Sequence, residues 1–216
     1  MKSNEGLNGT LEETKYFLKG ALKNLKEVGT LFPTSKWIAR AMCDPLLEAV
    51  GRGLKPAVIE AGTGSATRIL VSNIERLSRL VICECNQFYC EYLKALCEKI
   101  LKRRIDQVRQ LEIYQGYIQD YTSENQFDFI VCAVPFLCLD TLTNLQIMRK
   151  IKELSHSNTI MSLIEHLGSR PIRLAMNRDR RDFYRIVRKA QLDSKIIFKN
   201  YFPMKVIYLK PFLLEI

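Results

Sequence analysis

The sequence lacks several features that would place a protein in a common class. No apolar run approaches the roughly 20 residues that a transmembrane helix needs. The amino terminus is polar, so no signal peptide is visible, and there is no internal repeat or low-complexity tract. These absences predict a globular protein in the cytoplasm.

The sequence also lacks the paired C-x-x-C motifs that are typical of zinc sites. It has two histidines and seven cysteines, and several of the cysteines fall in segments that we predict to be buried. We therefore expect reduced thiols in the core and no metal site. The cysteines are at positions 43, 83, 85, 90, 97, 132 and 138.

Acidic residues are scarce relative to basic ones, most of all near the end of the sequence. The 216 residues carry a net charge of +10, and residues 170–216 hold 12 basic and 4 acidic side chains, a net of +8. A basic surface fits an anionic partner, which is nucleic acid, an acidic lipid or a phosphorylated substrate. The alternative is that these charges lie on solvated helix faces and only keep the protein soluble.

The segment 58–67 is the most informative feature that is present. Its apolar run ends at Glu60, turns through Gly62 and Gly64, and enters a helical pattern. Glycine allows such a turn and brings backbone close to a ligand, because it has no Cβ. A second apolar run ends at Glu84, 22 residues after Gly62. An acid about 20 residues beyond the turn is placed to accept hydrogen bonds from ribose hydroxyls.

This pattern departs from the dinucleotide-binding fingerprint, because Thr67 stands where a third glycine is expected. The carboxylate before the turn, Glu60, suits a ligand that has an ammonium group. Together, E-x-G-x-G and the distal acid resemble the cofactor site of class I methyltransferases, which bind S-adenosylmethionine. The alternative is an α/β domain with a tight glycine turn and no ligand.

Strand and helix patterns alternate along the chain, which implies a parallel sheet covered on both faces. The last two strands lack a helix between them and should form an antiparallel hairpin. We predict strands near 57–61, 80–84, 109–115, 127–133, 158–165, 195–200 and 205–210, with helices near 65–77, 87–103, 141–154 and 174–191.

This organisation is similar to the Rossmann-like, seven-stranded class I methyltransferase sheet, with helices on both faces and an antiparallel last strand. We expect that α/β domain to span 51–216. An amino-terminal helical segment, 1–50, should cover the site with helices at 11–28 and 35–50, the second of which contains Pro45.

Two motifs resemble those of bacterial phospholipid N-methyltransferases, to which the ribosomal RNA adenine dimethyltransferases are related. Residues 28–35 read V-G-T-L-F-P-T-S, and F-D-F-I-V at 127–131 is followed by V-P-F at 134–136. The resemblance implies N-methylation of a phospholipid amine, such as that of phosphatidylethanolamine, with S-adenosylmethionine as cofactor. It also implies an anionic membrane surface or phospholipid as partner, and peripheral attachment to the inner membrane face.

The resemblance further implies roles for individual residues. Glu60 and the glycine turn would line the methionine and ribose, and Glu84 would hold the ribose. Tyr117 and Ile118 would flank the adenine, while the amino-terminal segment would close over the cofactor. The cofactor-binding candidates are Thr30, Thr34, Ser35, Glu60, Gly62, Thr63, Gly64, Glu84, Tyr117, Ile118, Val134 and Pro135.

The acceptor is less well specified, because the sequence departs from the family pattern near the reacting groups. Ala133 replaces the glycine before the fourth-strand Leu-Pro, and Tyr117 follows Gly116 where an aspartate is frequent. Glu165 and His166, after the fifth strand, are candidate catalytic residues, and the alternative for both is a surface turn with local hydrogen bonds.

Other functions stay open at this point. Enzymes that methylate adenine carry an Asn or Asp at the position of Ala133, so adenine is disfavoured, although the basic carboxyl-terminal part suits nucleic-acid phosphates. An RNA or protein methyltransferase, or a non-catalytic cofactor-binding protein, is the alternative. The helix at 11–28 sets an apolar stripe beside a lysine face, which fits either a membrane surface or packing on the domain.

Overall fold

The computed structural model describes residues 35–61, 66–136, 138–167, 179–199 and 202–216, with only the backbone for 179–182. The helix that we expect at 11–28 lies outside these residues. The helices are α3 (Lys36–Gly51), α4 (Thr67–Ser72), α5 (Gln87–Leu101), α6 (Thr141–Glu153) and α8 (Asp179–Ala190). The strands are β1 (Ala57–Ala61), β2 (Arg79–Glu84), β3 (Leu111–Gln115), β4 (Phe127–Cys132), β5 (Ser155–His166), β6 (Gln191–Ile197) and β7 (Met204–Leu209).

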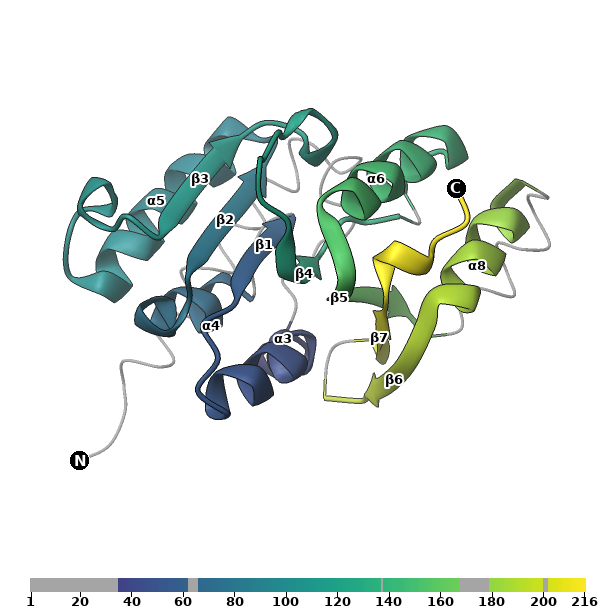
Figure 1. Ribbon diagram of the computed structural model, residues 1–216, viewed down its shortest axis with the longest axis horizontal. Coiled ribbons are helices and arrows are strands. Elements are labelled where there is room, and N and C mark those ends of the chain that lie inside the picture. Colours follow the sequence, from purple (N-terminus) through teal and green to yellow (C-terminus); the bar gives the residue numbers. More distant parts are fainter. Residues whose placement is uncertain (1–34, 62–65, 137, 168–178, 200–201) are drawn as a thin grey trace.

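The strands form one seven-stranded sheet in the order β3-β2-β1-β4-β5-β7-β6. Neighbouring strands from β3 to β5 are parallel, whereas β7 runs antiparallel to both β5 and β6. The core lies on both sides of the sheet, with α3, α4 and α5 packed on one face and α6 and α8 on the other (Figure 1). The predicted seven-stranded sheet, with helices on both faces and an antiparallel last strand, is confirmed.

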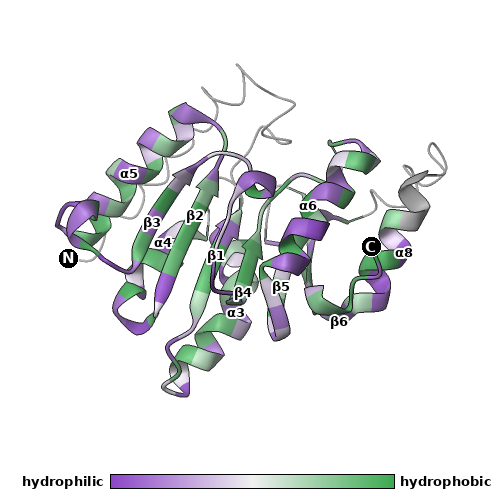
Figure 2. Ribbon diagram, turned by 45° about the horizontal axis from the view of Figure 1, so that its top comes forward, coloured by the Kyte–Doolittle hydropathy of each residue, from purple (hydrophilic) through white to green (hydrophobic). Residues whose placement is uncertain are grey.

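The hydrophobic pattern explains why the middle of the sheet forms as predicted. Strands covered on both faces need continuous apolar runs, and residues 80–83 of β2 are all buried. Figure 2 shows β1, β2 and β4 as largely hydrophobic, whereas α5 alternates between polar and apolar residues along its length. The helix α5 therefore buries one side and exposes the other, as an amphipathic surface helix does.

Two elements, the outer strand β6 and the helix α4, differ from the prediction in their bounds. Strand β6 begins at Gln191, four residues before the predicted start at 195, because it pairs with the whole of β7. Its early residues include the exposed Asp193, and charged side chains are common on edge strands, where one side of the backbone faces water. The predicted helix at 65–77 is shorter, since α4 ends at Ser72 and a 3-10 turn, Ile74–Arg76, follows it.

Pro45 lies inside α3 and has no N–H to donate to the carbonyl of Ala41, its i−4 residue. The phenol Oη of Tyr208, on β7, donates a hydrogen bond to that carbonyl oxygen at 2.6 Å. The two residues are buried and lie 167 positions apart in the chain. Strand β7 thus supplies the donor that the proline removes from the helix.

We expect Tyr208→Phe to lower the free energy of unfolding by about 1–3 kcal/mol, because the buried Ala41 carbonyl loses this donor. Urea unfolding measures the change. Pro45→Ala returns a backbone N–H to the helix, so Tyr208→Phe should cost less in that background. An equal loss of unfolding free energy in both backgrounds would show that the contribution of the Tyr208 hydroxyl does not depend on the missing N–H of Pro45.

Candidate functional site

The strand order reverses direction between β1 and β4. From β1 the chain continues to β2 and β3 on one side of this point, whereas β4 and β5 lie on the other side. Ligands of open α/β sheets bind at the carboxyl ends of the strands where the order reverses in this way. The backbone N–H of Ala133 donates to the carbonyl of Ala61 at 2.8 Å, so the two strand ends are joined there.

Glu60, the fourth residue of β1, is fully buried beneath this edge. Its Oε2 accepts a hydrogen bond from the Thr67 hydroxyl at 2.7 Å, while its buried Oε1 has no hydrogen-bond partner among the described residues. Burial raises the pKa of Glu60 to about 8, although the Thr67 hydrogen bond opposes the shift, and the negative charge of Glu84 adds to it. At neutral pH the carboxyl is therefore largely protonated, and it suits a ligand that brings a cationic donor.

Thr67 has a role that the sequence reading missed. It occupies the place of the absent third glycine and is the first residue of α4, where its buried hydroxyl reaches back seven positions to Glu60. The signal in the sequence is a hydroxyl residue at the start of the helix that follows the turn. The turn itself, with Gly62, Thr63 and Gly64, lies outside the described residues, so those three contacts stay predictions.

Glu84 ends β2 and is also buried. Its Oε1 accepts from the backbone N–H of Asn86 at 2.8 Å, and the Asn86 side chain in turn caps α5. The register pairs Glu60 with Ile82, so the side chains of Glu60 and Glu84 lie on the same face of the sheet, on neighbouring strands. The two carboxyl groups therefore border one part of the edge.

The segment after β3 continues this border. Gly116 donates its N–H to the Glu84 carbonyl at 2.9 Å, and a Cβ at this position would lie 2.7 Å from the Tyr114 ring. The Tyr117 side chain is exposed, whereas the Ile118 side chain is buried in the core with Ile59. Tyr117 and Ile118 thus face different surroundings, and their contacts with an adenine stay predictions.

The exit from β4 is a tight turn that contains Val134 and Pro135. The N–H of Phe136 donates to the Val134 carbonyl at 2.9 Å, which forms a γ-turn around Pro135. The side-chain amide of Asn144, on α6, donates to the Phe136 carbonyl at 2.8 Å and so ties the end of the turn to α6. Asn144 is a second residue that the sequence reading missed, because no local motif marks it. Its buried Oδ1 has no partner among the residues that the structure describes.

The remaining candidates lie farther along the same edge. Cys132 at the end of β4 pairs with Leu163, so Glu165 and His166 extend beyond β4 at the end of β5, next to β7. Ser35 caps α3, and its hydroxyl donates to the Lys199 carbonyl at 2.9 Å, between β6 and β7. Thr30 and Thr34 lie outside the described residues.

The structure therefore brings the described candidates to one edge, but in two groups. Glu60, Glu84, Tyr117 and the turn at 134–135 lie at the carboxyl ends of the strands from β3 to β4, whereas Ser35 and residues 165–166 lie at the β5–β7 end. The contacts of these candidates with a cofactor or an acceptor stay predictions, and Ile118 is buried in the core. Apart from the Thr67 hydroxyl at the start of α4, the sequence had no signal for the side-chain hydrogen bonds that hold these residues in place.

The structure also bears on metal binding and membrane spans. Across the described side chains, no group of three or more His, Cys, Asp and Glu residues could hold a metal ion. No helix in the described part of the chain has the length and hydrophobicity of a membrane span. Cys85 and Cys138 are exposed, whereas the other five cysteines are buried, and all seven are free thiols: Cys43, Cys83, Cys85, Cys90, Cys97, Cys132 and Cys138.

Comparisons with known proteins give structural similarity alone. No protein-family model matches the sequence, and no curated protein is significantly similar to it. The magnesium protoporphyrin IX methyltransferase of Synechocystis PCC 6803, solved with bound SAM, superposes with a TM-score of 0.59 at 10% identity, covering 96% of this chain and 100% of that one.

Two further structures are similar. The N-methyltransferase NodS from Bradyrhizobium japonicum WM9, in complex with S-adenosyl-L-homocysteine, has a TM-score of 0.56 at 10% identity, covering 79% of this chain and 85% of its own. An rRNA methylase from Streptococcus thermophilus has a TM-score of 0.51 at 8% identity, covering 78% of this chain and 96% of its own. At such identities the likeness shows the fold, which is that of the class I methyltransferases.

We expect Glu60→Gln to change how stability depends on pH. The folded protein holds the Glu60 proton more tightly than the unfolded chain does, so its stabilising contribution is complete below the unfolded pKa and is lost as the pH rises toward 8. Wild type should lose a few kcal/mol relative to the glutamine variant between about pH 5 and pH 9. Urea unfolding of both proteins at several pH values measures this difference, and parallel curves would contradict the buried neutral carboxyl.

Proposed function

We propose that the protein is an S-adenosylmethionine-dependent methyltransferase. The observation that carries this proposal is Glu60, a fully buried carboxyl with one bonded oxygen and one oxygen that lacks a partner among the described residues. A cofactor ammonium group would supply both the missing donor and a compensating positive charge. The fold, and the cofactor or its product bound to two neighbours of that fold, support the same reading.

The proposal assigns the rest of that cofactor to neighbouring residues. Glu84, held in place by the Asn86 backbone, would accept hydrogen bonds from the ribose hydroxyls. Tyr117 would lie beside the adenine, and Ser35 would close the site from α3. When bound, the cofactor supplies a sulfonium methyl that is displaced in line by the acceptor, so the gain comes mainly from alignment. The turn at 134–135, fixed by Asn144, would set the position of the acceptor.

The acceptor that we propose is the amine of a phospholipid headgroup. The turn between Cys132 and Phe136 contains Ala133, Val134 and Pro135, so its side chains offer no oxygen to a nucleobase amino group. The motif at 127–136 resembles that of phospholipid N-methyltransferases. An amine attacks only after it loses its proton, and Glu165 and His166, at the end of β5, are the candidates to accept that proton.

We expect wild-type protein to bind S-adenosylmethionine and to release a proton at about pH 7, since the cofactor ammonium ionises the Glu60 carboxyl. Isothermal titration calorimetry in buffers of different ionisation enthalpy measures affinity and proton release together. Glu60→Gln should abolish the release and weaken binding by about ten- to a hundredfold, the usual range for losing a hydrogen bond to a charged group.

Glu153→Gln is the matched control, because this carboxylate is exposed at the end of α6, where it pairs with Lys150. It should bind the cofactor as wild type does. No binding by wild type would refute the cofactor proposal, and full affinity in Glu60→Gln would refute the role of this carboxyl.

We expect labelled methyl groups to appear in lipid when the enzyme and labelled cofactor are incubated with vesicles that contain phosphatidylethanolamine. Vesicles of phosphatidylcholine alone, whose headgroup nitrogen is already fully methylated, are the control and should remain unlabelled. Thin-layer chromatography of the extracted lipids measures the product. Label in added RNA but not in lipid would replace the lipid acceptor with a nucleic acid.

A further inference from the structure

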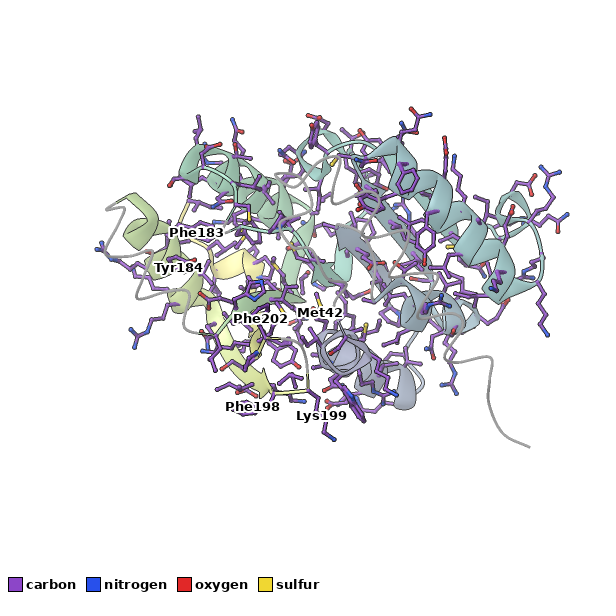
Figure 3. All side chains as sticks on the ribbon, turned by 180° about the vertical axis from the view of Figure 1, so that it is seen from behind. Met42, Phe183, Tyr184, Phe198, Lys199 and Phe202 are labelled. Atoms are coloured by element: carbon purple, nitrogen blue, oxygen red, sulfur yellow. The ribbon has the colours of Figure 1, made fainter. Side chains whose placement is uncertain are left out.

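Large apolar side chains are exposed together at the β6–β7 end of the sheet. Phe198 and Phe202, on the connection between β6 and β7, are 70% and 62% exposed, and Trp37 on α3 is 47% exposed. Leu167, directly after β5, is exposed as well. Figure 3 shows Phe198, Lys199 and Phe202 in this region, on the same side of the molecule as Met42 of α3. We call the set Trp37, Leu167, Phe198, Lys199 and Phe202 the aromatic–lysine patch.

The patch is held by hydrogen bonds to regular structure. The Ser35 hydroxyl, at the start of α3, donates to the Lys199 carbonyl at 2.9 Å. The N–H of Leu167 donates to the Pro203 carbonyl at 3.0 Å, so the connection is also fastened to the end of β5. These bonds fix the backbone that carries the exposed apolar side chains. An exposed apolar cluster of this kind indicates an interaction surface.

The charges around the patch indicate an anionic partner. The Lys199 ammonium lies 4.5 Å from the centre of the Trp37 ring, and the Lys36 ammonium lies 5.3 Å from it. Neither ammonium has a carboxylate within salt-bridge distance among the described residues. Trp37 thus combines an apolar ring with two lysine charges, the combination that anchors proteins at a bilayer surface.

A single-stranded nucleic acid is a poorer fit to the same residues. Such ligands bind through bases stacked on open aromatic faces. At Trp37 the ring is already within cation–π distance of two ammonium groups, and Leu167 adds aliphatic surface that has no face for stacking. Exposed aliphatic and aromatic groups beside lysines match acyl chains beside anionic headgroups.

We propose that the aromatic–lysine patch docks the protein on an anionic phospholipid bilayer. This inference rests on the proposed function, which it deepens by naming the surface that meets the lipid. The patch adjoins the end of β5, two strands from β1. At a strand spacing of about 4.8 Å, the two strand ends lie about 10 Å apart. Docking there would bring the carboxyl edge of the sheet close to the headgroups.

The sequence contains one tryptophan, so the fluorescence of Trp37 reports on the patch directly. Full-length protein is mixed with vesicles of phosphatidylcholine alone, or of phosphatidylcholine and phosphatidylglycerol. With the anionic vesicles the emission should shift to shorter wavelength, and brominated acyl chains should quench it. The double variant Phe198→Ser/Phe202→Ser should lose about tenfold or more in vesicle affinity, measured by co-sedimentation. Lys199→Gln should lose about fivefold.

Phe212→Ser is the matched control, because Phe212 is 50% exposed and follows β7 at the opposite edge of the sheet. It should bind vesicles as wild type does. Vesicle binding without a change in Trp37 emission would overturn the proposal, as would full affinity in the double variant. Loss of RNA binding instead of vesicle binding in the double variant would reassign the patch to nucleic acid.

This experiment needs no turnover, so it fails or succeeds separately from methyl transfer. Docking without labelled lipid would leave the patch standing and refute the lipid acceptor. Labelled lipid without a change in Trp37 emission would support the lipid acceptor and refute the patch as the docking surface. Calorimetry with the cofactor, together with the thermal midpoint, shows that each variant is folded.

Discussion

The buried carboxyl of Glu60 is the constraint on which the rest of the site depends. An ionised carboxylate that is removed from water is costly unless a cation or several donors compensate it. The Thr67 hydroxyl donates a hydrogen bond to one oxygen of this carboxyl, and the other oxygen lacks a partner among the described residues. The group is therefore stable either as a neutral acid or beside a positive charge. The charge state of this one residue thus depends on the charge that lies beside it.

Backbone hydrogen bonds between strand ends give this carboxyl a fixed frame. Ala133 bonds to Ala61, and Gly116 bonds to Glu84, so β4 is joined to β1 and β3 to β2 at the edge itself. Side chains that are mounted on such a frame are oriented before a ligand arrives, which lowers the cost of ordering them on binding. The same edge continues to β5 and β7, where the aromatic–lysine patch begins.

The sequence predicted the elements well, because apolar runs with polar ends mark strands covered on both faces. Glu60 and Glu84 lie near the ends of β1 and β2 for the same reason, since each stands where such a run ends. The side-chain hydrogen bonds around them were not predicted. Thr67 looks like a missing glycine, and Asn144 lies in a helix with no motif. The partnership of Ala41 with Tyr208 joins residues 167 positions apart, so no local pattern reveals it.

The place of β7 in the sheet has a consequence for how the molecule is assembled. This strand comes after β6 in the chain but lies between β5 and β6. Until residues 204–209 have been synthesised, β5 remains a sheet edge and β6 has no neighbour to pair with. The nascent protein therefore exposes an unpaired edge of β5 while the roughly 40 residues that lead to β7 are synthesised, and exposed strand edges favour pairing with other chains. The sheet is therefore completed late in synthesis, and the Tyr208 contact to α3, which joins distant parts of the chain, forms only then.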